Sequence, residues 1–181
     1  MDEKKPQSGL VSRRTFVESV AVAAGVMIVP RHVLGGTGFV APSDQVNLAT
    51  VGYRWGMGTS NTEAAAKVPG VNFVALCDVD DSEGARKASE KVHALLPNAK
   101  FYKDYRVMLE KQKDIDGVIV ATPDHAHAVV AMASMQLGKH VYVQKPMTHT
   151  VSEARALTEA ARRYKVVTQM GNQATPAKAS T

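Results

Sequence analysis

Gly52 and Asp78 have the residue types and the spacing of a dinucleotide-binding site. Gly52 follows the apolar run 46–51, where a glycine allows a tight turn into a helix whose N-terminus binds a pyrophosphate. Asp78 ends the next apolar run 26 residues later, near the separation of about 20 residues expected for the acid that binds the adenosine ribose. A carboxylate there accepts hydrogen bonds from both ribose hydroxyls and repels a 2′-phosphate. The pair predicts NAD, with NADP less favoured; by itself, Asp78 is more typical of a solvated strand-end acid or a helix N-cap.

The glycines after Gly52 depart from the usual dinucleotide pattern. G-x-G-x-x-G would require glycine at positions 54 and 57, which hold Arg54 and Met57. Glycines occur instead at Gly56 and Gly58. Two interpretations stay open. A longer turn would let Gly56 and Gly58 approach the pyrophosphate, with Arg54 adding a positive charge, or the loop is a plain connection that no longer binds phosphate.

Lys145 is the candidate catalytic residue. Hydride leaves an alcohol carbon only as the O–H proton is lost, so a base or a cation must lie near that oxygen. Lys145 comes shortly after the apolar run 141–143, and a lysine at a strand end beside a cofactor crevice can take this part. The alternative is a surface lysine in front of Pro146.

Asp124, His125 and His127 invite comparison with a metal site. The His-x-His spacing lacks the i,i+4 face of a helical zinc pair. Capping, packing or contact with a cofactor fits these side chains better, so we predict no metal.

The elements that must position these residues alternate between strands and helices. The expected strands are the apolar runs 46–51, 71–78, 101–102, 115–121, 141–143 and 166–168. The expected helices are a stretch that follows Gly52 to Val68, then 82–96, 104–111, 123–137 and 151–164. The expected capping signals are Ser60 with Glu63, Thr122 before Pro123, and Thr150 with Glu153. Unbroken apolar strands that alternate with helices predict an α/β fold of the Rossmann type, a doubly wound parallel sheet that binds ligands at its carboxyl ends.

Residues 1–40 have the features of an export signal and linker. The segment Ser12-Arg13-Arg14-Thr15-Phe16-Val17 precedes the apolar run 20–29, which is too short to span a bilayer. It resembles the twin-arginine signal S/T-R-R-x-F-L-K, with Val17 and Glu18 in place of the last two residues. We expect recognition by the export machinery and a periplasmic location. The alternative is an amphipathic N-terminal helix of the folded domain.

Composition excludes several classes of protein. The 181 residues include 22 Lys and Arg against 17 Asp and Glu, and 45% are hydrophobic, which is typical of a globular protein. The positive charges beyond residue 40 are scattered, so we predict no nucleic-acid partner. No stretch of the sequence is predicted to form a stable membrane span. Because Cys77 is the only cysteine, an internal disulfide is excluded.

Four segments in chain order carry a family pattern: 77–80 (CDVD), 121–128 (ATPDHAHA), 138–146 (GKHVYVQKP) and 168–173 (TQMGNQ). Together they resemble the nucleotide-binding domain of the Gfo/Idh/MocA family, over roughly 44–173. The resemblance implies an NAD(P)-binding Rossmann domain followed by a second α/β domain that makes much of the substrate pocket. It also implies oxidoreduction at a hydroxyl carbon of a sugar or cyclitol, a small-molecule sugar or polyol substrate, and association into homo-oligomers.

The resemblance assigns roles to individual residues. The family motif E-K-P corresponds to Gln144-Lys145-Pro146, in which the lysine orients or polarises the substrate hydroxyl and the change to Gln144 removes a charge beside it. The 121–128 segment would lie under the cofactor. The cofactor-binding residues that we expect are Gly52, Gly56, Gly58, Asp78, Thr122, Pro123, Asp124, His127 and Gln144.

One expected feature of the family does not occur in these 181 residues. Members place the proton-transferring histidine in a D-x-x-x-H segment of the second domain, and this sequence contains no such segment. We therefore expect the cofactor domain of a longer oxidoreductase, with 174–181 as a frayed tail. The alternative is a non-catalytic nucleotide-binding or interaction module.

Overall fold

The structure is a computed structural model that describes residues 40–172 of the 181-residue chain. The chain divides between Pro42 and Ser43 into two units, and the whole sheet belongs to the second. The predicted export signal falls almost entirely outside the described residues, and the predicted frayed tail falls wholly outside them.

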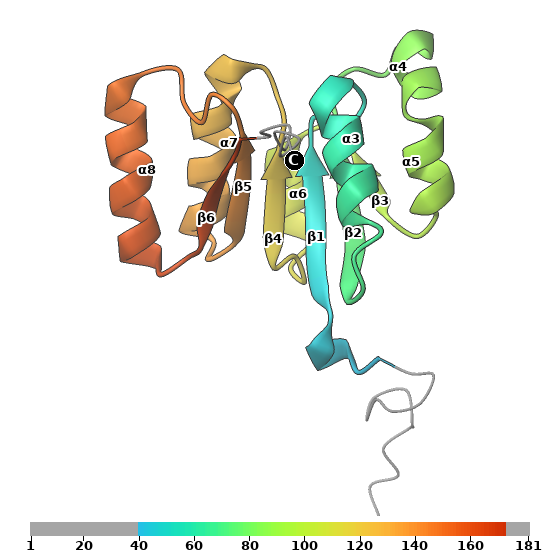
Figure 1. Ribbon diagram of the computed structural model, residues 1–181, viewed down its shortest axis with the longest axis horizontal. Coiled ribbons are helices and arrows are strands. Elements are labelled where there is room, and N and C mark those ends of the chain that lie inside the picture. The colour runs from blue at the N-terminus through green and yellow to red at the C-terminus, as the bar shows by residue number, and fades with distance from the viewer. Residues whose placement is uncertain (1–39, 173–181) are drawn as a thin grey trace, which may run out of the picture. The chain divides into compact units, whose positions relative to one another are not determined.

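Six parallel strands form one sheet in the order β3-β2-β1-β4-β5-β6 (Figure 1). Every neighbouring pair is parallel. The strands are β1 (Val46–Val51), β2 (Val71–Cys77), β3 (Lys100–Tyr102), β4 (Gly117–Val120), β5 (His140–Gln144) and β6 (Thr168–Gly171). The short 3-10 helix η1 (Pro42–Asp44) precedes β1, and the α-helices are α3 (Gly56–Ala65), α4 (Glu83–Ala88), α5 (Glu90–Leu95), α6 (Tyr105–Lys111), α7 (Asp124–Gln136) and α8 (Val151–Tyr164). The predicted Rossmann-type sheet is confirmed.

Two separate cores cover the two faces of this sheet. Successive residues of a strand point to opposite faces, so Val118 and Val120 of β4 pack on one side and Ile119 on the other. The larger core joins the strands to α6, α7 and α8, and its residue Met135 on α7 is fully buried. The smaller core joins β2 and β4 to α3 and α5 around Tyr53, whose side chain is also fully buried. Burial on both faces explains why β4, at the centre of the sheet, is apolar without alternation.

The helix signals were correct in part. Thr150 and Glu153 form the predicted capping box of α8, and Gly138 has the positive φ, +72°, that ends α7. The predicted Ser60 cap is wrong, because α3 already begins at Gly56 and the Ser60 hydroxyl donates to the Gly56 carbonyl within the helix. The predicted Thr122 cap is also wrong, because Pro123 occupies the N-cap position of α7.

Several element boundaries also differ from prediction, most of them by one or two residues, as where the expected strand 115–121 is β4 over Gly117–Val120. The expected helix 82–96 divides into α4 and α5 at Ser89, where φ is −103° and ψ is 6°. The last strand starts at Thr168 instead of Val166, because residues 166 and 167 connect α8 to the sheet. There the backbone N–H of Val167 donates to Nδ1 of His140 over 2.9 Å. No helix within residues 40–172 is long and apolar enough to cross a membrane.

Candidate functional site

Gly52 and Gly58 form a close-packed turn between β1 and α3. Gly52 has φ +86°, and a Cβ there would lie 2.6 Å from the carbonyl oxygen of Ala121. A Cβ on Gly58 would lie only 1.8 Å from the carbonyl oxygen of Gly52. These are the contacts that the first and last glycines of a dinucleotide turn make possible. The two glycines are six positions apart instead of five, so the turn is longer by one residue, and Gly56 at φ +52° opens the helix.

Arg54 does not supply positive charge to the turn as one interpretation expected. The residue is 3% exposed and its guanidinium lies over the rings of Tyr53 and Phe101, at 5.2 and 4.9 Å from their centroids. Nη1 donates to the Ser89 hydroxyl over 3.3 Å, and Nη2 lies 3.6 Å from the carboxylate of Asp81. The positive charge of Arg54 is therefore paired with groups of the protein itself, on the α5 side of the sheet. Its partner Ser89 lies at the junction of α4 and α5.

Asp78 lies at the carboxyl end of β2 and is held by two loops. Its Oδ2 accepts the backbone N–H of Arg54 over 2.9 Å, and its Oδ1 accepts the backbone N–H of Asp80 over 3.0 Å. The residue is 8% exposed. A carboxylate has about four acceptor positions, so each oxygen retains capacity for a further donor such as a ribose hydroxyl.

A cavity of about 650 Å³ lies at the carboxyl ends of β1, β2 and β4. Four of the predicted site residues line it: Gly52, Asp78, Thr122 and Pro123. The other predicted positions, including Gly56, Gly58 and Lys145, are not in its wall. The sequence prediction missed several wall residues, namely Trp55, Asp80, Lys103, Tyr105 and Arg106. Their positions in the sequence could have indicated them, because Trp55 lies within the glycine turn and residues 103–106 follow directly after β3.

The remaining predicted residues gather around the ends of β4 and β5. Nδ1 of the buried His127 lies 2.7 Å from the Pro146 carbonyl oxygen, and because a carbonyl only accepts, Nδ1 carries the proton. Oε1 of Gln144 accepts the backbone N–H of Lys145 over 3.0 Å. The side chain of Lys145 is exposed, as is that of Asp124.

Three buried polar atoms at these strand ends have no hydrogen-bond partner within the described part of the chain. They are Thr122 Oγ1, His127 Nε2 and Gln144 Nε2. Buried polar atoms in native proteins are nearly always satisfied, because leaving one unpaired costs about 1–3 kcal/mol. Thr122 lines the cavity, whereas His127 and Gln144 lie at the strand ends outside its wall. Unpartnered polar atoms in this region fit a site completed by a polar ligand, and the nicotinamide and ribose groups of a dinucleotide offer suitable donors and acceptors.

The charged groups at the rim are largely paired with one another. Lys103 contacts Asp81 at 3.0 Å, and Arg106 makes several hydrogen bonds to Asp104. Hydrogen bonds from Arg86 and Lys103 hold the pKa of Asp81 well below its usual range, so this carboxylate stays ionised. Within residues 40–172, no cluster of three or more His, Cys, Asp or Glu side chains is arranged to hold a metal ion.

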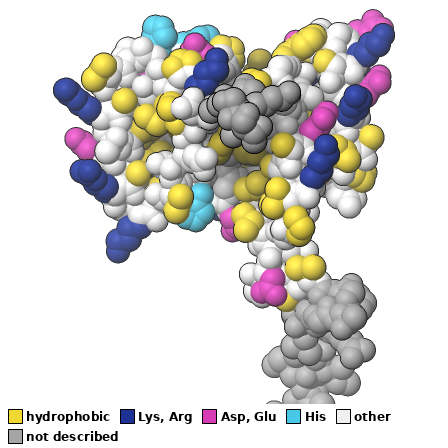
Figure 2. All heavy atoms as spheres, viewed as in Figure 1, with side chains coloured by type: hydrophobic (Ala, Val, Ile, Leu, Met, Phe, Trp, Pro, Cys, Tyr) yellow, Lys and Arg dark blue, Asp and Glu magenta, His cyan; other side chains and the backbone are white. Residues whose placement is uncertain are grey.

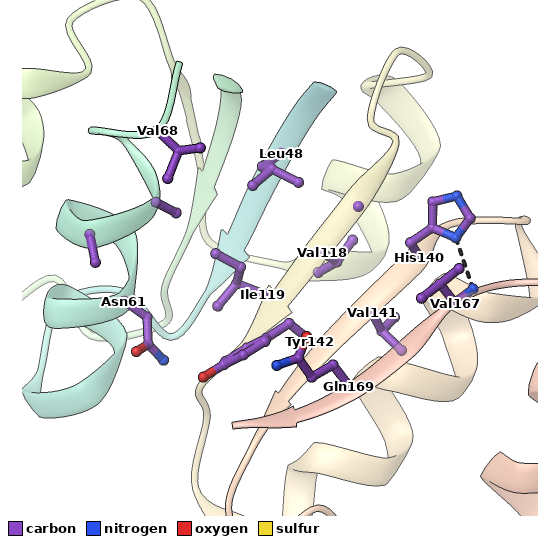
Figure 3. A pocket seen from close by; sticks show the side chains of 13 residues that line it. Leu48, Asn61, Val68, Val118, Ile119, His140, Val141, Tyr142, Val167 and Gln169 are labelled. Atoms are coloured by element: carbon purple, nitrogen blue, oxygen red, sulfur yellow. Dashed lines mark hydrogen bonds between the residues drawn. The ribbon is translucent and has the colours of Figure 1, made fainter. Parts of the chain in front are cut away.

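A second cavity, of about 460 Å³, lies on the apolar sheet face between α3 and β6 (Figure 3). Leu48, Ile119 and Val141 contribute its apolar wall, and Tyr142 and Gln169 lie side by side at one end. Hydrophobic side chains are visible in the hollow of this face in the space-filling view (Figure 2). It does not include the carboxyl-end residues that carry the polar chemistry.

The comparisons with known proteins agree with this geometry. The model of the Gfo/Idh/MocA oxidoreductase family, described as an NAD-binding Rossmann fold, matches residues 46–172, and this chain belongs to that family. Among solved structures, GenD2 from gentamicin A biosynthesis, in complex with NAD, is 26% identical. Its TM-score is 0.62, and the match covers 80% of this chain and 37% of that one.

Curated relatives include two proteins named as glycosidases. The glycosyl hydrolase family 109 protein 1 of Shewanella sp. strain MR-4 is 30% identical over 172 residues. The α-N-acetylgalactosaminidase of Shewanella oneidensis is 30% identical over 175 residues. Each match covers 84% of this chain and 37% of the relative, so the chain spans little more than a third of the length of these proteins.

Proposed function

We propose that this chain is the cofactor domain of an NAD-dependent oxidoreductase that acts on a hydroxyl carbon of a sugar or cyclitol. The observation that carries the proposal is the Asp78 carboxylate, held at the carboxyl end of β2 in the wall of the 650 Å³ cavity. An acid at this position recognises the ribose hydroxyls of NAD. Gly52 and Gly58 supply the turn that brings the N-terminus of α3 to the pyrophosphate.

The residues divide into cofactor and substrate groups along the sheet edge. Asp78, Gly52, Thr122 and Pro123 would hold the dinucleotide, which when bound supplies the hydride acceptor. Lys145 would lie at the substrate oxygen and either accept its proton or stabilise the oxyanion. Nδ1 of His127 donates to the Pro146 carbonyl, and the buried Nε2 has no hydrogen-bond partner in the described part of the chain, so Nε2 would form a hydrogen bond with the ligand.

Fluorescence tests the cofactor proposal directly. Trp55 is the only tryptophan in the sequence and lines the cavity, so titration of the 181-residue chain with NADH should quench Trp55 emission in a saturable way. Asp78→Asn should weaken NADH binding by about tenfold to a hundredfold, because hydrogen bonds to a charged group are involved. Absence of saturable binding at millimolar NADH would refute the cofactor role.

A second candidate, hydrolysis of a glycoside, is favoured by relatives that are 30% identical and named as glycosidases, the two described above among them. NAD-dependent glycosidases exist as an exception to the usual two-carboxylate mechanism. The two functions are separated by product analysis of the complete protein with a free sugar and with an α-N-acetylgalactosaminide. Net NADH formation supports the oxidoreductase, and sugar release without net NADH supports the glycosidase.

The proposal includes export by the twin-arginine route to the periplasm, supported by the sequence of residues 12–17 and 20–29. Replacing both Arg13 and Arg14 by Lys should retain the protein inside the cell. Cell fractionation measures this, and unchanged delivery of the variant would contradict the proposal.

A further inference from the structure

Trp55 links the glycine turn to the loop that follows β2. Its indole Nε1–H donates to Oδ2 of Asp80 over 2.8 Å. The far edge of the ring lies over α4, where a Cβ on Gly84 would be 3.6 Å from the indole. Both Trp55 and Asp80 line the 650 Å³ cavity, and Trp55 is 53% exposed. This Trp55–Asp80 bridge therefore stands in the cavity wall next to Asp78.

The bridge is joined to the ribose acid through the backbone. The N–H of Asp80 donates to Oδ1 of Asp78, and Oδ1 of Asp80 accepts the N–H of Ser82 over 3.0 Å. These contacts fix the two carboxylates in one short turn. The backbone N–H of Ser82, followed by the Trp55 indole, lowers the pKa of Asp80, so its carboxylate is ionised at neutral pH.

The nearby cations are already engaged by other carboxylates. Lys103 pairs with Asp81, Arg106 pairs with Asp104, and the guanidinium of Arg54 is buried on the other side of the loop. A 2′-phosphate carries a charge of about −1.5 to −2 and requires an available cation or several donors. The bridge instead adds a negative charge and a large ring beside the ribose acid.

We propose that the Trp55–Asp80 bridge selects the cofactor, by closing the side of the ribose site where a 2′-phosphate would lie. NAD(H) would then be bound and NADP(H) rejected. This inference rests on the proposed function, because it concerns the same cavity, and it assigns the selectivity to two residues beyond the ribose acid itself.

Calorimetric titration of the full chain with NAD and with NADP tests the inference. The unmodified protein should bind NAD at least about tenfold more tightly than NADP. Asp80→Asn removes the charge and should reduce this preference by about tenfold, the scale expected for charges close together near a protein surface. Trp55→Phe keeps an aromatic ring but loses the N–H, and should reduce the preference by about threefold.

Glu110→Gln is the matched control, because it removes one negative charge from the exposed surface of α6, outside the cavity wall. Its NAD preference should be unchanged. Circular dichroism melting verifies the folding of each variant. If Asp80→Asn fails to fold, the NAD preference of the conservative variant Trp55→Phe tests the inference instead.

The outcomes separate the two proposals. If the unmodified chain binds NAD but both bridge variants retain its preference within about twofold, the bridge does not select the cofactor and the proposed function stands. A parent protein that prefers NADP would also overturn the inference while leaving dinucleotide binding intact. Binding of neither dinucleotide would overturn the proposed function and the inference together.

Discussion

The backbone N–H of Arg54 donates a 2.9 Å hydrogen bond to Oδ2 of Asp78. The residue that interrupts the glycine pattern therefore holds the carboxylate predicted to bind the ribose. Its side chain turns the opposite way, under α4 and α5, where it contacts Ser89, Asp81 and the ring of Phe101. The loop is thus anchored at its centre by a buried side chain, in place of the flexible glycine that the usual pattern has there.

Arg54→Ala should destabilise the protein more than it weakens NAD binding. The substitution keeps the backbone N–H to Asp78 but removes a buried cation from between Ser89 and Asp81, and it leaves a cavity beside Phe101. We expect a loss of about 1–3 kcal/mol in the free energy of unfolding, from unsatisfied polar groups and lost packing. Urea unfolding measures this loss.

Arg54→Lys is the informative companion variant. Lysine keeps the charge but lacks the planar guanidinium, which lies over two aromatic rings and contacts both Ser89 and Asp81. Most of the loss in the free energy of unfolding should therefore remain. Wild-type stability in Arg54→Ala would contradict the anchoring role.

Gly58→Ala should damage both stability and cofactor binding. The new Cβ would meet the Gly52 carbonyl oxygen at 1.8 Å, and since that atom belongs to the backbone, the turn itself must move. We expect a cost of about 1–3 kcal/mol, as for overpacking elsewhere, together with weaker NADH binding in the Trp55 titration.

Gly84→Ala is the control for this prediction. Gly84 lies within α4, and a Cβ there would make ordinary contact with the Trp55 ring at 3.6 Å. Alanine at this helical position should be neutral or stabilising by up to about 1 kcal/mol. Equal effects of the two substitutions would show that the close approach of Gly58 to Gly52 has no special importance.

The parts that sequence predicts well are those that depend on local periodicity. Residues 117–120 form a strand whose side chains are buried on both faces, and the apolar run in the sequence records this. Residues 140–144 are buried less completely, with His140 exposed and Tyr142 half-buried, and the sequence signal is the short apolar run 141–143. Gly52 and Asp78 are recognisable because each must follow a strand directly. The split at Ser89 was not predicted from the local sequence, and the Ser89 hydroxyl there accepts a hydrogen bond from the guanidinium of Arg54, which is distant in the sequence. Trp55 had a positional signal within the glycine turn, but its hydrogen bond to Asp80, 25 residues away, could not be predicted from the local sequence.

Lys145→Ala should leave dinucleotide affinity unchanged and reduce turnover in the complete enzyme. Lys145 is exposed and does not line the 650 Å³ cavity, whereas its backbone N–H is fixed by Gln144 at the end of β5. Loss of a general acid or base lowers rates by about 10²- to 10⁴-fold. Steady-state kinetics and NADH titration of the same variant measure both quantities. Weakened binding with normal turnover would place Lys145 in the cofactor group instead.

Stability should fall in mildly acidic solution because of His93. The Tyr53 hydroxyl lies 2.8 Å from Nε2 of His93, and burial, followed by the charge of Arg54, lowers the pKa of this histidine. The unfolded chain has the ordinary histidine pKa of about 6.5, so below that pH it binds a proton that the folded chain binds less readily. The free energy of unfolding therefore decreases as the pH falls through about 6.5 toward the lower pKa that His93 has in the folded state. Urea midpoints on either side of this range measure the loss. His93→Gln should flatten that part of the profile, and an unchanged profile in the variant would assign the pH dependence to other groups.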